Sequence, residues 1–208
     1  MRQRFLIAIA VFLAFIVGAA EIAVAESPYE TLEKAAEAMD KGDGATFQRF
    51  VDLDSLLERA LSEFIADTAR NKDIYPAPIV FIMEQASDPG FKGRAMRGLM
   101  LAEAKDFMID GVSSGAFAGR KLRYEARSGV LAPLFSNMSL GKKEILGVGD
   151  GIRDGDDVIL PFSLHDYGND QDYAVKGRFA RNGDSWRLTA IENLPEIFEQ
   201  LRREALAE

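Results

Sequence analysis

The sequence contains no cysteine. This absence excludes disulfide bonds, thiolate metal sites, a cysteine nucleophile and a lipid anchor attached through cysteine. The fold must therefore be held together by an apolar core, which is feasible for a chain of 208 residues. Apolar residues make up 48% of the chain and charged residues 28%, values typical of globular proteins that exclude wholesale disorder.

Histidine is almost as scarce, with a single residue, His165. With one histidine and no cysteine, a zinc or copper site would depend mainly on carboxylates, so we predict neither a metal nor another cofactor. We interpret His165 as a solvated residue at the end of a strand. The alternative is a general base in a pocket, paired with a nearby carboxylate.

One short motif raises the possibility of a serine hydrolase. Residues 111–115 read Gly-Val-Ser-Ser-Gly, but a nucleophile elbow needs a strand before its serine. Here the preceding residues follow a helical pattern, and we expect Gly111 to end that helix. The sequence therefore predicts no catalytic residue.

Positive charge is in the minority, because 25 Lys and Arg oppose 33 Asp and Glu and give a net charge of −8. This excess argues against nucleic acid as a partner, since such binding depends on neutralising phosphates. The basic side chains are concentrated in residues 92–143, which hold 10 of them against 4 acidic ones. Residues 26–91 hold 6 and 14, and residues 144–208 hold 7 and 14. An acidic protein thus has a basic middle segment.

The one long hydrophobic run lies at the N-terminus, from Phe5 to Ala20, after the basic start Met-Arg-Gln-Arg. Ala23-Val24-Ala25 fits the rule for signal peptidase, so residues 1–25 are predicted to be a cleaved signal peptide. The alternative is an uncleaved anchor, although 16 residues are fewer than the about 20 that span a bilayer. We expect a periplasmic or secreted protein, or one anchored in the inner membrane with its domain outside the cytoplasm, and membrane contact only through this segment.

Residues 28–115 show helical patterns. Ser27-Pro28-Tyr29-Glu30 is a capping box with proline at the first helical position, and Gly42 is expected to end this helix. Further helices are predicted near 53–65, 78–86 and 93–110 from apolar residues spaced by three and four. In the last of these helices, Met96, Leu99 and Met100 are expected to face inward.

From residue 142 the apolar period changes to two, which predicts strands. Residues 142–192 are expected to form an antiparallel meander of about four strands, after a variable loop region over 116–141 and before a final helix over 195–206. N-terminal helices packed on a C-terminal sheet make a single α+β domain over 26–208.

The aspartate-rich stretch GVGDGIRDGDDVILPF, residues 147–162, resembles a metal-binding loop only superficially. If Asp150 were the first position of a calcium loop, Ile152 and Pro161 would stand where oxygen ligands are needed. Asp154-Gly155 instead predicts the first hairpin turn of the sheet, with weak calcium binding as the alternative.

Two stretches resemble an uncharacterised family of small bacterial envelope proteins. These are EAMDKGDGATFQRFVDLDSLLERAL (37–61) and DSWRLTAIENLP (184–195). In that family an exported leader precedes a helix ending in Gly-Asp, then a Val-Asp-Phe/Leu segment and a late Trp-Lys-Leu strand closed by Leu-Pro. The predicted sheet is similar to those of cystatin-like and NTF2-like folds. The resemblance implies an envelope protein but no particular activity.

A possible ligand site combines methionines with basic side chains in the middle of the chain. Its candidate residues are Met96, Met100, Arg120, Lys121, Arg123 and His165. Adaptable methionines beside cations would suit an anionic or hydrophobic molecule, or an acidic partner in the envelope. The alternatives are that the methionines fill the core and that the cations, including Lys92, Arg94 and Arg97, pair with the protein's own acidic helices. We therefore expect a non-catalytic binding or interaction module. The alternative is an NTF2-like pocket protein that binds a small molecule or a lipid, or that acts as an enzyme using His165 with a nearby carboxylate.

Overall fold

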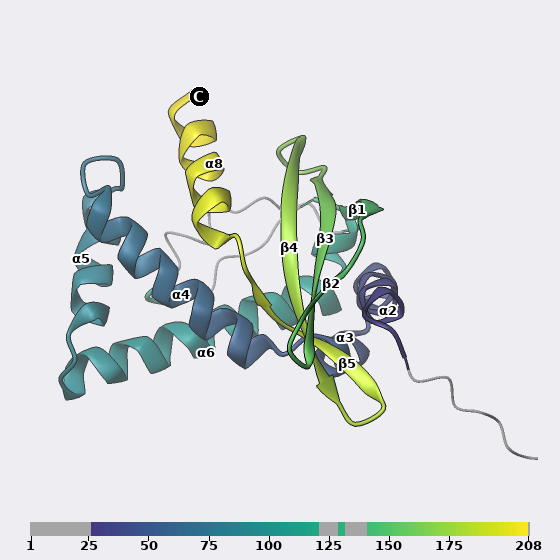
Figure 1. The fold of residues 1–208 in the computed structure, drawn as a ribbon. Coiled ribbons are helices and arrows are strands. Elements are labelled where there is room, and N and C mark those ends of the chain that lie inside the picture. The colour runs from purple at the N-terminus through teal and green to yellow at the C-terminus, as the bar shows by residue number, and fades with distance from the viewer. Residues whose placement is uncertain (1–25, 121–128, 132–140, 208) are drawn as a thin grey trace, which may run out of the picture.

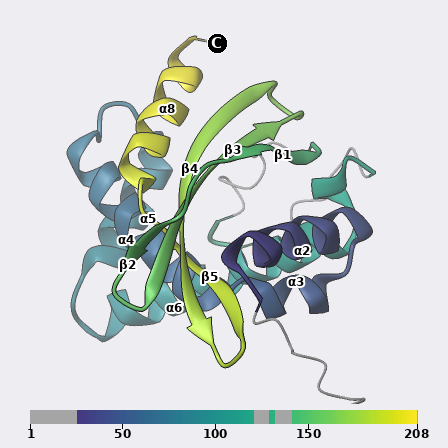
Figure 2. The same ribbon diagram turned by 45° about the vertical axis from the view of Figure 1, so that its right-hand side comes forward.

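A computed structural model describes residues 26–120, 129–131 and 141–207. Its helices are α2 (Pro28–Lys41), α3 (Gly44–Phe50), α4 (Leu53–Arg70), α5 (Ala77–Ser87), α6 (Phe91–Ser113), the 3₁₀ turn η1 (Ala116–Ala118) and α8 (Leu194–Ala207). Its strands are β1 (Lys143–Val148), β2 (Ile152–Asp154), β3 (Asp157–Asp166), β4 (Gln171–Asn182) and β5 (Ser185–Ile191). In both views, β3 and β4 run between α8 and α2 (Figures 1 and 2).

The first helices begin and end where side chains satisfy their terminal backbone groups. Ser27 and Glu30 form the predicted capping box of α2, and Gly42 ends that helix with a φ of 75°, a conformation that glycine adopts without strain. The carboxylate of Asp43 then accepts a hydrogen bond from the N–H of Thr46 and starts α3. These local signals fix the N-terminal boundaries.

The sheet is antiparallel, with the order β1-β3-β4-β5 and with β2 also paired to β3. Strands β1 and β2 lie one after the other along the same edge of β3. The break between them faces Pro161, which has no N–H to donate to a neighbouring strand. Its carbonyl accepts a hydrogen bond from Gly149 N–H. Two tight hairpins join β2 to β3 and β4 to β5, with φ of 64° at both Gly155 and Gly183.

Three apolar clusters hold these elements together. One joins α2 to the sheet through Leu32, Leu160, Phe179 and Trp186. A second joins α2, α3, α4, α6 and η1, and it includes Phe47, Phe50, Phe107 and Phe117. A third lies among α4, α5 and α6 and includes Ile65, Ile79, Met83 and Met100. The helices α4 to α6 therefore have a core of their own beside the sheet.

The outer edge of β5 is closed by the N-terminal part of the chain. Glu26 N–H donates to the carbonyl of Asp184 at 3.2 Å, and Asp52 N–H donates to that of Leu188 at 2.9 Å. Between them, Thr31 Oγ1 donates to the carbonyl of Trp186 at 3.4 Å. This strand edge is thus satisfied by residues that lie more than a hundred positions earlier in the sequence.

The α+β architecture and the hairpin turn at Asp154-Gly155 agree with the sequence predictions, but three details differ. The sheet has five strands rather than about four. Helix α6 continues past Gly111 to Ser113, because Gly111 packs against the Phe117 ring as an interior helical residue. Leu99 is 48% exposed instead of facing inward, because the buried face of α6 is centred on Gly93, Met100 and Phe107.

Candidate functional site

His165 lies near the C-terminal end of β3, opposite Asp172 on β4. Its Nδ1 is 2.6 Å from Asp172 Oδ1, and its Nε2 is 3.6 Å from Asp170 Oδ1. The Tyr167 ring contacts the imidazole edge-on, with ring centroids 4.2 Å apart. The cross-strand pairing of β3 with β4 therefore brings the histidine against two carboxylates and an aromatic ring.

A second polar group adjoins this histidine. Tyr167 Oη donates to Glu144 Oε2 at 2.7 Å, and Lys142 Nζ donates to the same oxygen at 2.9 Å. These two hydrogen bonds lower the pKa of the Glu144 carboxyl, Tyr167 contributing most. The hydrogen bond to Glu144 in turn raises the pKa of the Tyr167 phenol. The ionised carboxylate is thus the favoured state beside His165.

This arrangement orients the imidazole as a possible base. If Nδ1 carries the proton donated to Asp172, the lone pair is on Nε2. His165 lies one residue before the end of β3, as predicted, and 16% of its side chain is exposed, so it is half-buried instead of fully solvated. The cross-strand carboxylate was not identified from the sequence because the register of β3 on β4 determines it.

Arg120 lies at the C-terminal end of α2, where its guanidinium donates to the carbonyl of Asp40. Gly119, the residue before Arg120, lies close to Lys142, because a Cβ added to Gly119 would be 3.5 Å from that residue. Lys142 belongs to the polar group beside His165, so Arg120 and His165 lie at the same end of the sheet. The other basic candidates, Lys121 and Arg123, lie outside the described residues.

The two methionine candidates lie elsewhere. Met100 is fully buried in the core of α4 to α6, and Met96 packs half-buried against the same cluster. This agrees with the core-filling alternative, because a fully buried side chain offers no surface to a ligand. The structure therefore does not bring the methionines together with His165.

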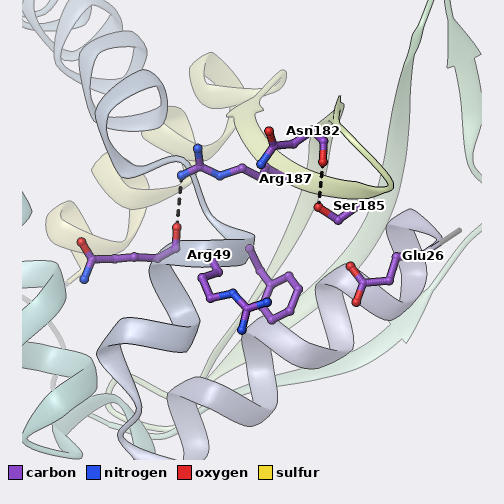
Figure 3. A pocket seen from close by; sticks show the side chains of 7 residues that line it. Glu26, Arg49, Asn182, Ser185 and Arg187 are labelled. Carbon is purple, nitrogen blue, oxygen red and sulfur yellow. Dashed lines mark hydrogen bonds between the residues drawn. The ribbon is translucent and has the colours of Figure 1, made fainter. Parts of the chain in front are cut away.

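A shallow, open pocket of about 380 Å³ lies between α3 and the β4–β5 hairpin (Figure 3). Arg187 donates there to the carbonyls of Gln48 at 3.1 Å and Val51 at 3.3 Å and pairs with Asp52 at 3.6 Å. Glu26, on the opposite wall, pairs with Lys34. Because these charges already have partners within the protein, we interpret the pocket as the boundary where α3 packs against the β4–β5 hairpin, not as a ligand site. A second hollow beside it shares Glu26 and Arg49, and His165 lines neither of them.

A different surface, which sequence patterns did not reveal, lies on α5 and the start of α6. Phe91 is 80% exposed and Phe81 62% exposed, and Leu99 is also on the surface. We call residues 77–99 the α5–α6 corner. Its signal in the sequence was the apolar character of residues 77–83 on every side of the helix, which indicates an unusual environment.

Comparison with protein-family models, with curated proteins and with solved structures finds no match. Among residues 26–120, 129–131 and 141–207, no three His, Cys, Asp or Glu side chains are grouped so that they could hold a metal ion. Within the same ranges, no helix is both long and apolar enough to cross a membrane.

Proposed function

We propose that the protein is an exported component of the bacterial cell envelope that acts as a non-catalytic binding module. The leader pattern of residues 1–25 supports export. The ion pairs and hydrogen bonds within the fold support a non-catalytic role, because they occupy many of its reactive groups. Arg178, for example, is held by Asp154, Asp157 and Glu192.

The observation that carries the proposal is the outward position of large apolar side chains on the α5–α6 corner. Single exposed apolar residues are common on protein surfaces. Here two phenylalanines and a leucine, each about half exposed or more, follow one another on a helical hairpin whose inner face is fully packed. Exposed aromatic side chains supply much of the binding energy where proteins meet partners.

Site-specific photo-crosslinking in the producing bacterium tests this function. A photoreactive phenylalanine analogue replaces Phe81 or Phe91 in the full chain, and a matched control replaces Asp156 in the exposed β2–β3 turn. We expect an adduct at positions 81 and 91 and none at 156. No adduct at either phenylalanine, or equal yield at 156, would refute the proposal.

The second candidate is an enzyme in which His165 acts as a general base. The 2.6 Å contact with Asp172 favours it, since this orientation leaves Nε2 free to accept a proton. The test compares the wild-type protein with His165→Gln on a panel of activated esters and glycosides. Turnover by the wild type that disappears in the variant supports the enzyme, and equal background rates exclude it for these substrates.

A further inference from the structure

Helix α5 buries one apolar face and exposes a large aromatic side chain, Phe81, on the other face, beside the polar residues Glu84 and Gln85. Ile79, Met83 and Ala86 are buried in the core of α4 to α6. Phe81 points away from that core and is 62% exposed. The only ionisable residue of the helix, Glu84, is paired with Lys72 at 2.6 Å. The first seven residues of α5, 77–83, contain no polar side chain, although Ala77, Pro78 and Phe81 are exposed.

The beginning of α6 adds positive charge to this surface. Lys92, Arg94 and Arg97 follow directly after Phe91, and none of them forms an ion pair with a carboxylate of the described residues. Arg94 donates to the carbonyl of Pro89 at 2.6 Å and Arg97 to the hydroxyl of Ser62 at 2.8 Å, neutral acceptors that leave both charges uncompensated. Lys105, farther along α6, does pair with Asp54 of α4 at 2.6 Å, so pairing with the acidic helices holds for part of the basic segment and not for these three cations among the described residues.

The α5–α6 corner is the end of the helical part that lies farthest from α2 and β1 (Figure 1). Helix rise places Phe81 about 9 Å from the C-terminal end of α5, and Phe91 opens α6 just beyond the turn. Phenylalanine and leucine side chains flanked by cations thus occupy one projecting corner of an otherwise acidic protein.

We propose that the α5–α6 corner docks on the surface of a lipid bilayer that carries anionic headgroups. Phe81, Phe91 and Leu99 would enter the boundary between headgroups and acyl chains, while Lys92, Arg94 and Arg97 contact phosphate groups. The inference rests on the proposed function and names the partner of the same surface. It goes beyond the sequence expectation, which limited membrane contact to the N-terminal segment.

Charge complementarity favours a lipid surface over a protein partner. The corner presents three cations that have no ion pair among the described residues. Of its two acidic residues, Glu84 is paired with Lys72, and Asp88 accepts a hydrogen bond from Gly90 N–H but keeps its charge, so positive charge predominates. A net charge of −8 repels the rest of the molecule from an anionic membrane. An approach led by this corner brings its cations toward the anionic surface first.

A fluorescence titration tests the docking. Because the chain has no cysteine, Ala95→Cys gives one labelling site on the exposed side of α6 for an environment-sensitive dye. The labelled full chain is titrated with vesicles of phosphatidylglycerol and phosphatidylcholine, and with phosphatidylcholine alone. We expect a blue shift with the anionic vesicles only, and its loss at high salt. A dye at Asp156→Cys should show no shift.

Two triple variants, both made in the Ala95→Cys protein, are compared by the lipid concentration that each needs for binding. Lys92→Gln/Arg94→Gln/Arg97→Gln should need about 100-fold more lipid, because each cation near an anionic surface contributes about fivefold. The matched control Arg49→Gln/Arg153→Gln/Lys176→Gln removes the same charge from exposed cations elsewhere and should titrate like the parent. Circular dichroism verifies that both variants fold.

Absence of a shift with anionic vesicles, an equal shift with phosphatidylcholine alone, or equal titration of the two triple variants would each overturn the inference. Photo-crosslinks from positions 81 and 91 to a protein, together with no vesicle binding, would overturn the lipid inference and leave the binding module intact. Absence of both would refute the proposed function as well.

Discussion

A buried carboxylate, Asp67, holds α8 against α4. We expect the loss of its charge partner to lower the free energy of unfolding measurably. Asp67 has only 3% of its side chain exposed and contacts Arg202 of α8 at 2.5 Å. Tyr75 Oη also donates to Asp67 at 2.5 Å, and Asn71 Nδ2 donates at 3.2 Å. Burial, together with the hydrogen bond to Asp67, raises the pKa of the Tyr75 phenol to about 12. Arg202→Met removes the main compensating charge and keeps much of the side-chain volume.

Removing one partner of a buried ion pair costs about 3–5 kcal/mol, because the other charge remains buried without compensation. Asp67 retains its hydrogen bonds from Tyr75 and Asn71, and Arg70 remains 3.7 Å away, so we expect the lower end of that range. The predicted loss for Arg202→Met is about 3 kcal/mol of unfolding free energy. Asp67→Asn/Arg202→Met should lose about 1–2 kcal/mol, since no unpaired charge remains.

Urea unfolding provides the measurement, because the chain has a single tryptophan, Trp186, which is buried in the sheet core. Its fluorescence and the far-UV circular dichroism should change together if unfolding is two-state. A loss below about 1 kcal/mol for Arg202→Met would refute the assigned role of Asp67. The same conclusion follows if the free energy lost by the double variant equals the sum of the losses of Asp67→Asn and Arg202→Met measured separately.

Three further predictions use the same unfolding assay. Phe179→Ala should lower the free energy of unfolding by about 3–5 kcal/mol, because this fully buried ring joins the sheet to α2. Phe81→Ala, at the surface, should change it by less than about 0.5 kcal/mol. Similar losses for the two variants would contradict the assigned cores. Gly111→Ala should cost about 1–3 kcal/mol, because its Cβ would lie 2.3 Å from the Phe117 ring, and an unchanged midpoint would show that the ring moves freely. Ser27→Ala should cost about 1 kcal/mol through loss of the α2 cap. The hydrogen bond from the Ser27 backbone N–H to the Glu30 carboxylate, followed by that from the Ser27 hydroxyl, lowers the pKa of Glu30. The stabilisation that comes from this carboxylate is therefore present above pH 4.5 and lost as the pH falls through the lowered pKa. A wild-type stability profile no steeper than that of Glu30→Gln below pH 4.5 would contradict this.

Much of the fold could be predicted because its boundaries are encoded by nearby residues. The capping box at Ser27, the Gly42 terminus and the Asp-Gly turn at Asp154 all act within four positions, and the structure agrees with each. Leu99 shows the limit of this reasoning. It follows a helical apolar pattern, but which side of α6 is buried depends on where α4 and α5 pack.

The candidate sites were harder to predict because distant contacts create them. His165 meets Asp172 only through the register of β3 on β4. The surface position of Phe81 depends on α5 burying Ile79 and Met83 instead. The resemblance to envelope proteins and to the NTF2-like sheet stays a prediction, as does the ligand role of Lys121 and Arg123.

The closure of β5 by the N-terminal part of the chain has a consequence for the order of folding. The contacts from Glu26, Thr31 and Asp52 reach residues 184–188, so they form only when the β4–β5 hairpin has been synthesised. Such long-range contacts delay the cooperative step of folding. The capped helix α2 can form early, but it lacks its permanent packing surface until the chain is almost complete. The contacts between α2 and the sheet are therefore among the last to form during synthesis, whereas the core of α4 to α6 involves only residues up to 131 and can form earlier.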